Sequence, residues 1–330
     1  MDEQKDTYQY RNIIKVIGVG GGGNNAVNHM YLQDIEGVTF VVSDTDKHRL
    51  DESSVPNHLL LGPNTTQGQS AINDHGVARR AAEESEPEIA ALFDDNTKMV
   101  IITAGMGGDT GTGAAPVVAR IAHEKGVLTV GLVTIPFLFE GTERNLKALA
   151  GIEEMSKYVD ALFIINNERL TEIYSDLNRS NAFLKADETL TIVVSSLCGL
   201  LDVDDRVCLD FNDVNYTLHK GGNSFIVSGF GSGERRVTKT LENALESPLL
   251  KNCDVFSFKK ILMILYYNPY SDFPLLMEEM NEIQEFMNHF DQEVDVIWGM
   301  AFDDKLDDQI KVTILASGCN MSYSLPLEQD

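Results

Sequence analysis

The chain has 330 residues, of which 43% are hydrophobic and 23% charged, so it can bury a large core and we expect two folded domains. Its formal net charge of −25, without a cluster of Lys or Arg, argues against a nucleic-acid partner because such a chain repels phosphate backbones. Four widely spaced cysteines, no signal-like N-terminus and no apolar run of about 18 residues favour a soluble cytoplasmic protein with reduced thiols and no direct membrane insertion.

The first half of the chain has the pattern of an α/β domain. Residues 1–12 are polar and lack periodicity, so we expect a flexible N-terminal arm. From residue 13, short apolar runs alternate with helical stretches, which predicts a parallel sheet covered by helices. The runs are nearly continuous in Val, Ile and Leu, as expected of strands buried on both faces. The predicted strands are residues 13–20, 38–44, 99–105, 127–136 and 161–167.

The second half begins with a long apolar helix. Residues 187–201 carry apolar side chains around most of the helix circumference, which predicts a buried central helix. Two helices and about four strands follow, and they indicate a smaller α+β domain. The predicted helices are residues 235–250 and 275–290, and the predicted strands are residues 223–231, 259–268, 295–304 and 310–318.

A glycine cluster follows the first predicted strand and opens a helix. Backbone without Cβ atoms can approach a phosphate closely, and the helix N-terminus supplies free amides. Gly18, Gly20 and Gly23 also fit the dinucleotide fingerprint, with Asp44 ending the next strand, so an NAD-dependent oxidoreductase stays a remote alternative. The candidate phosphate-binding residues of this loop are Gly20, Gly21, Gly22, Gly23, Asn24 and Asn25.

A second glycine cluster, residues 104–116, again leaves a strand and enters a helix, whose first turn we expect to hold Pro116. Two such loops in one sheet suggest two cradles around one polyphosphate. No Walker loop with its lysine is present. The candidate residues here are Gly107, Gly108, Asp109, Thr110, Gly111, Thr112 and Gly113.

The two clusters together resemble the FtsZ and tubulin family. The segment GMGGDTGTG is similar to the family signature GGGTGTG, with Asp109 in place of a glycine, and the first cluster is similar to the FtsZ motif GVGGGGGN, with Asn24 in place of another. The motifs follow the family order over residues 12–319. The resemblance implies a Rossmann-like parallel-sheet GTP-binding domain, a long buried central helix and a smaller α+β C-terminal domain. It also implies a polymer-forming GTPase of bacterial cell division.

The same resemblance implies a guanine nucleotide as ligand. Glu140 and Arg144 fall in the family's ribose and phosphate loop, and Asn167, Phe183 and Asp187 fall where the family stacks and hydrogen-bonds guanine. An aromatic face plus a carboxylate that accepts from the guanine N1 and N2 hydrogens suits that base. GTP or GDP is therefore expected, with Mg²⁺ carried by GTP and no metal ligand from a protein side chain.

A catalytic loop is implied after the central helix. Asp210 and Asp213 match the family's carboxylates, which act on the GTP of the neighbouring subunit, whereas Cys208 departs from the pattern. A helix from Asp187 to Leu201 would span about 22 Å, too far for Asp210 to reach the nucleotide of its own chain. We therefore expect a head-to-tail homopolymer whose active site is shared by two subunits.

Three departures from the family pattern favour an alternative, a divergent FtsZ-like paralogue that binds nucleotide and assembles but hydrolyses poorly. They are Asp109, Cys208 and Asp44, which is also expected to be a GTP-binding residue and stands where the family usually has Asn. Two unit charges about 4 Å apart repel by about 4 kcal/mol at an effective dielectric of about 20, so Asp109 should oppose the terminal phosphate of GTP.

Each candidate carboxylate also has an ordinary structural interpretation. Asp109 could stabilise a helix N-terminus, and Asp187 could cap the central helix. Asp210 and Asp213 could be solvated loop carboxylates.

The expected domains and partners follow from these assignments. Division-ring membrane tethers are expected as partners only if a C-terminal tail exists beyond residue 330, and the cytoplasmic location is expected to be at the division site. The domains are an arm at 1–12, the GTP-binding domain at 13–186, the central helix and connection at 187–207, the C-terminal α+β domain with its catalytic loop at 208–319, and a tail stub at 320–330.

Overall fold

The structure is a computed structural model that describes residues 13–71, 74–174, 178–201, 209–247, 250, 257–290 and 293–319. The expected arm, the expected tail stub and Cys208 lie outside the described residues. The chain divides into two compact units between Ser195 and Ser196. The domain bounds expected from the sequence stay a prediction.

The first unit contains a parallel sheet with strand order β3-β2-β1-β4-β5-β6. In its centre Val16 lies beside Phe40 on one side and Ile101 on the other. This sheet confirms the predicted α/β class, and the three-residue β3 was missed because so short a strand shows no periodicity. The strands are β1 (Ile14–Val19), β2 (Val38–Asp44), β3 (His58–Leu60), β4 (Met99–Gly105), β5 (Leu128–Ile135) and β6 (Ala161–Asn166).

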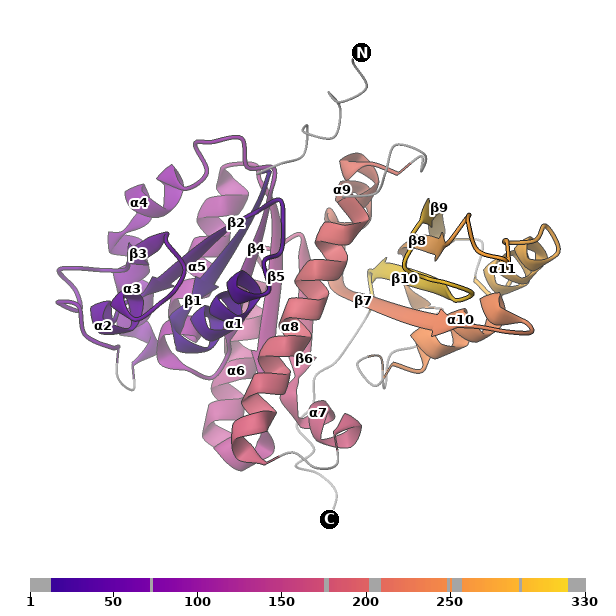
Figure 1. The fold of residues 1–330 in the computed structure, drawn as a ribbon. Coiled ribbons are helices and arrows are strands. Elements are labelled where there is room, and N and C mark those ends of the chain that lie inside the picture. The colour runs from indigo at the N-terminus through magenta and orange to yellow at the C-terminus, as the bar shows by residue number, and fades with distance from the viewer. Residues whose placement is uncertain are drawn as a thin grey trace. The chain divides into compact units, whose positions relative to one another are not determined.

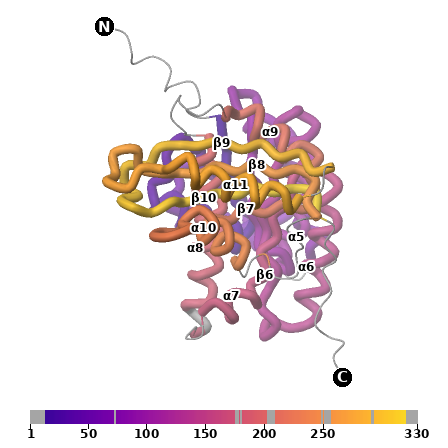
Figure 2. The backbone as a smooth tube through the Cα atoms, turned by 90° about the vertical axis from the view of Figure 1, so that its right-hand side faces the viewer, coloured from indigo at the N-terminus to yellow at the C-terminus, as the bar shows by residue number. Residues whose placement is uncertain are grey.

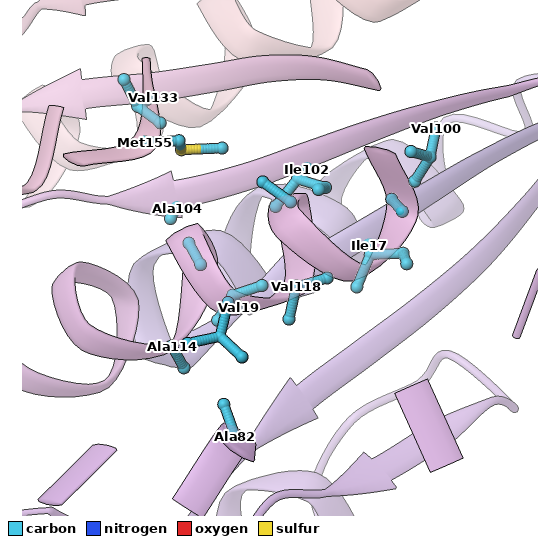
Figure 3. Packing of buried hydrophobic residues seen from close by; sticks show 14 of the residues in the cluster. Ile17, Val19, Ala82, Val100, Ile102, Ala104, Ala114, Val118, Val133 and Met155 are labelled. Carbon is cyan, nitrogen blue, oxygen red and sulfur yellow. The ribbon is translucent and has the colours of Figure 1, made fainter. Parts of the chain in front are cut away.

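Helices cover both faces of this sheet (Figure 1). Helix α1 packs on β1, β2 and β4, while α5 lies on the opposite face. There Ala114 and Val118 of α5 meet Ile17 of β1 and Ile102 of β4 in the main core (Figure 3). The helices are α1 (Gly20–Leu32), α2 (Lys47–Asp51), α3 (His75–Glu84), α4 (Glu86–Ala91), α5 (Asp109–Glu124), the 3-10 turn η1 (Leu138–Glu140), α6 (Thr142–Met155) and α7 (Asn167–Ile173).

Two helix starts differ from the sequence expectation. Helix α5 begins at Asp109, so Pro116 lies inside it and not in its first turn, because the glycine-rich segment itself winds into helix. Helix α8 (Arg179–Leu201) begins well before the predicted start at residue 187. Asp187 therefore lies inside this helix and cannot cap it.

The second unit contains a mixed sheet with strand order β7-β10-β8-β9. Strand β10 is antiparallel to β7 and β8, and β9 is parallel to β8. Figure 2 shows these strands side by side. Helices α10 and α11 contribute Val237, Leu241 and Ile283 to the hydrophobic core on this sheet. The elements are α9 (Phe211–Leu218), β7 (Gly222–Gly231), α10 (Arg236–Leu245), β8 (Lys260–Tyr267), α11 (Glu279–Met287), β9 (Asp295–Phe302) and β10 (Ile310–Ser317).

A buried ion pair joins α10 to α11. Arg236 is 7% exposed, and its Nε and Nη2 donate to the two carboxylate oxygens of Glu279 at 2.6 and 2.9 Å. The remaining guanidinium hydrogens go to the carbonyls of Phe273, Pro274 and Asp308. Burial is the largest single influence and would raise the pKa of Glu279, but the hydrogen bonds from Arg236 and the Leu276 amide, together with the Arg236 charge, lower the pKa.

Among the described residues, no helix is both long and apolar enough to cross a membrane.

Candidate functional site

A cavity of about 310 Å³ opens at the carboxyl ends of the parallel strands in the first unit. Ligands of open α/β sheets bind at this edge, where the loops leave the strands. Most of the site residues expected from the sequence line it. They are Gly20, Gly21, Gly22, Asn25, Gly108, Asp109, Thr110, Gly111, Glu140, Arg144, Asn167, Phe183 and Asp187.

The two glycine-rich loops meet at the floor of the cavity. Gly20 has a φ of +71°, and a Cβ atom there would lie 2.8 Å from the amide nitrogen of Gly111. Helix α1 starts at Gly20 with Val19 as its cap, and α5 starts at Asp109 with Gly108 as its cap. The first amides of both helices have no carbonyl partner within the helix, so two positive helix ends converge on one space. This arrangement can hold an anion.

Part of the first loop lies behind the wall instead of on it. A Cβ atom at Gly23 would overlap the carbonyl oxygen of Thr103. Asn24 is buried and exchanges two hydrogen bonds with the backbone of Ser43, at 3.1 and 3.2 Å. These contacts fix the start of α1 against the end of β2, which gives Asn24 a structural task.

Asp44 is fully buried behind the same wall. Its carboxylate accepts from the amide of Asp46 at 3.2 Å and from Asn24 Nδ2 at 3.5 Å. Burial raises the pKa of Asp44, although the Asp46 amide and the Arg49 charge work against that shift. Its assignment to the nucleotide stays a prediction.

The end of the second loop also turns away from the cavity. Thr112 accepts from the amide of Gly107 through its Oγ1 at 2.8 Å, which holds the loop closed on itself. Thr112 and Gly113 line a separate cavity of about 240 Å³ between α3, α5 and α6. The first turn of α5 therefore has one face on each cavity.

Asp109 is the first residue of α5 and lines the main cavity. An acidic residue in the first turn of a helix favours the positive end of the helix dipole, which agrees with the interpretation that Asp109 stabilises a helix N-terminus. The pKa of Lys147 is raised, mainly by its hydrogen bond to Glu143 and to a small extent by the charge of Asp109. The carboxylate thus stands where an incoming anion would meet it.

One end of the cavity is suited to a planar base. Phe183 meets Phe137 edge to face, with ring centroids 5.4 Å apart, and its ring lines the wall. Asn167 is 4% exposed, and its buried Oδ1 has no hydrogen-bond partner among the residues that the structure describes. Burial raises the pKa of Asp187 to about 7. These two oxygens can accept hydrogen bonds from a ligand.

Glu140 and Arg144 form an ion pair beside this end. The Glu140 carboxylate, 8% exposed, accepts from the amide of Phe137 at 2.9 Å and pairs with Arg144 Nη1 at 3.1 Å. The pair is held in position by the backbone. The Arg144 side chain is half exposed and can still turn one edge to a ligand.

Sequence reasoning missed several residues of the wall. Arg49 on α2 is the most important of them, because it is a cation in a site expected to lack lysine. The available signal was a basic residue a few positions after a predicted strand, because the carboxyl end of that strand lies at the ligand-binding edge of the sheet. The other missed residues are Val19, Ser70, Gly105, Met106, Thr134, Pro136, Ala186 and Leu190.

The predicted catalytic carboxylates belong to the second unit. Asp210 caps α9 through a hydrogen bond from the amide of Asn212 at 2.7 Å, and Asp213 accepts from the amide of Asp210 at 2.8 Å. Both carboxylates therefore take part in a reciprocal capping box at the start of α9, while Asp210 is exposed to solvent. The described residues contain no group of three His, Cys, Asp or Glu side chains that could hold a metal ion.

Comparisons with known proteins agree across both units. The Tubulin/FtsZ family GTPase domain matches residues 13–175, and the FtsZ family C-terminal domain matches residues 222–320. The cell division protein FtsZ of Porphyromonas gingivalis is 48% identical over 310 residues, which are 94% of this chain and 67% of that protein.

Two further relatives extend this result. The cell division protein FtsZ of Buchnera aphidicola is 39% identical over 319 residues, which are 96% of this chain and 82% of that protein. The solved empty FtsZ dimer of M. jannaschii is similar with a TM-score of 0.82 and 34% identity, over 94% of this chain and 89% of that one.

Proposed function

The chain belongs to the FtsZ family, and from that premise we propose that it binds GTP with Mg²⁺, assembles head to tail and hydrolyses GTP between subunits during bacterial cell division. The observation that carries the proposal is the cavity, which has two helix N-termini at one end and at the other the Asn167 Oδ1, a buried acceptor without a hydrogen-bond partner in the described part of the chain. Because the chain belongs to this family, the alternative of an NAD-dependent oxidoreductase is not favoured. The relatives are named as the cell division protein FtsZ, which does not favour the alternative of a divergent paralogue that hydrolyses poorly.

Guanine is the base that the Asn167 end accepts best. Its N1 and N2 hydrogens are donors, and the oxygens of Asn167 and Asp187 are acceptors. Adenine would offer an acceptor at N1 instead of a donor, so it would leave these acceptors unsatisfied. Phe183 supplies the ring against which the base packs.

The phosphates fit the opposite end, over the amides of Gly20–Gly22 and Gly108–Gly111. The wall carries three acidic residues, Asp109, Glu140 and Asp187, and two basic residues, Arg49 and Arg144. The acidic residues offset the basic ones, so the protein does not neutralise the charge of a triphosphate by itself. Mg²⁺ prefers oxygen ligands and keeps several waters, which suits an ion held by the phosphates without a protein cage. When bound, it would neutralise phosphate charge.

Hydrolysis is assigned to Asp210 and Asp213 acting on the GTP of a neighbouring subunit. Every lining residue of the cavity belongs to the first unit, whereas these carboxylates belong to the second. The capping box fixes both side chains against the start of α9, so they can orient a water without moving. Self-assembly of the relative, solved as a dimer, supports the same arrangement.

Phosphate release measured against protein concentration tests this proposal. Turnover per subunit should rise with concentration, because each complete active site needs two chains. A constant specific activity down to very dilute protein would contradict the shared site. Mass spectrometry of the nucleotide released from the purified protein tests the choice of guanine separately.

A further inference from the structure

Arg49 is a cation on the cavity wall, and the proposed function gives it no binding role. It lies on the short helix α2, and its Nη1 would be 2.6 Å from a Cβ atom added at Gly21, so the guanidinium lies over the first glycine-rich loop. Arg49 pairs with Asp46, with Nε to Oδ2 at 3.7 Å, and the Arg49 side chain is 54% exposed. Such a long, solvated contact holds the side chain weakly.

Arg144, the other cation on the described wall, is held differently. Its Nη1 lies 3.1 Å from Glu140, whose carboxylate is buried and anchored to the backbone. Arg49 therefore has the more available guanidinium of the two. A guanidinium presents a planar set of donors that matches the oxygens of a phosphate in a two-pronged contact.

The order of the strands indicates which part of a nucleotide Arg49 can reach. Asn167 follows β6, Asp109 follows β4, Gly21 follows β1 and Arg49 follows β2, in the sheet order β2-β1-β4-β5-β6. Neighbouring strands are about 4.8 Å apart, so β6 and β2 are separated by about 19 Å along the sheet edge. With the base at the Asn167 end, only the remote end of an extended nucleotide reaches Arg49.

We propose that Arg49 binds the terminal phosphate of GTP and makes the cavity prefer the triphosphate to the diphosphate. This inference rests on the proposed function, since it takes the ligand to be a guanine nucleotide. Asp109 repels negative charge in the phosphate half of the cavity, and Arg49 offsets that repulsion where the additional charge of GTP lies. GDP does not extend far enough to use the contact.

The test compares Arg49→Gln with the wild-type chain and with Arg79→Gln. Arg79 is a matched control because its side chain is 55% exposed and it lines the second cavity instead of this one. Titration calorimetry would measure the affinity for GDP and for a non-hydrolysable GTP analogue with Mg²⁺, at protein concentrations too low for assembly. Arg49→Lys keeps the charge without the planar fork.

Arg49→Gln should weaken the GTP analogue by about tenfold or more, the usual range for a charge-assisted hydrogen bond, and GDP by much less. Arg49→Lys should fall between, and Arg79→Gln should change neither affinity. Equal weakening of both ligands, or no weakening, would overturn the proposal. A wild-type chain that binds neither guanine nucleotide would instead refute the proposed function, so the two failures are distinguishable.

Discussion

The nucleotide cavity of the first unit and the Arg236 cluster of the second unit hold buried polar groups in opposite ways. Each of the five N–H donors of Arg236 has an acceptor, and Glu279 is fixed in return. In the cavity, the Oδ1 of Asn167 has no hydrogen-bond partner within the described ranges, and burial raises the pKa of Asp187 to about 7. Satisfied buried groups stabilise the fold, whereas the buried Oδ1 of Asn167 can still accept a hydrogen bond from a ligand.

The largest expected effect comes from removing the satisfied cluster. Arg236→Met should lower the free energy of unfolding by about 3 to 5 kcal/mol, because it removes the positive charge and two hydrogen bonds from the Glu279 carboxylate and one donor from each of three carbonyls. Guanine nucleotide affinity should stay unchanged. Urea unfolding and nucleotide titration would measure the two effects. The neighbouring Arg235→Met, at an exposed position, is the control, and a loss below about 1 kcal/mol for Arg236→Met would contradict the comparison.

The second prediction tests whether the second unit contributes to GTP hydrolysis as well as to the stability of the fold. Asp210→Asn keeps a good helix cap but removes the charge, so GTP turnover should fall by about 100-fold or more while nucleotide affinity of the unassembled protein holds. Phosphate release and calorimetry would measure both. Asn212→Ala, which removes one contact to the same carboxylate without changing the charge, should retain most turnover. A parallel loss of affinity in Asp210→Asn would mean that the carboxylate is structural.

A smaller effect is expected at the phosphate end of the cavity. Asp109→Gly removes a negative charge from the wall, so GTP should bind about tenfold more tightly if 1.4 kcal/mol of repulsion survives screening. GDP carries less charge and should gain less. Calorimetry with and without Mg²⁺ would measure this. Equal gains would indicate that Asp109 acts only by occupying amides, and unchanged affinities would mean that it faces away from the phosphates.

The smallest effect concerns the pH dependence of base recognition. Burial raises the pKa of Asp187 to about 7, so in the empty cavity the carboxyl binds a proton below that pH. Guanine donors favour the ionised carboxylate, so affinity should fall as the pH drops from 8 to 6, by at most tenfold per unit below about 7.

Guanosine is the appropriate ligand for that measurement because it has no phosphate that titrates in the same range. Fluorescence or calorimetric titrations of wild type and Asp187→Asn would be compared across the pH range. The variant should bind weakly with little dependence on pH. A flat profile for the wild type would show that Asp187 does not contact the base.

The sheet was predictable because its strands are buried on both faces. Residues 99–105 were expected as a strand, and β4 occupies the same positions. The start of α5 was not predictable, since glycine lowers helix propensity. The start of α8 was placed too late because Asp187 was taken as a possible cap, although Ala182, Ala186 and Leu190 form one buried face across it. Those helices form there because the surrounding sheet and loops supply packing contacts and hydrogen-bond partners.

The sequence by itself determined the family, the α/β class and the two glycine-rich loops, because these depend on local patterns of apolar residues and missing Cβ atoms. Only the tertiary structure decided which charges face the cavity. Asp109 lies on its wall and Asp44 behind it, while Arg49 joins the wall from a segment with no recognisable motif. The reason is the strand order, since β2 lies beside β1 and β1 beside β4, and no local pattern encodes which strands become neighbours.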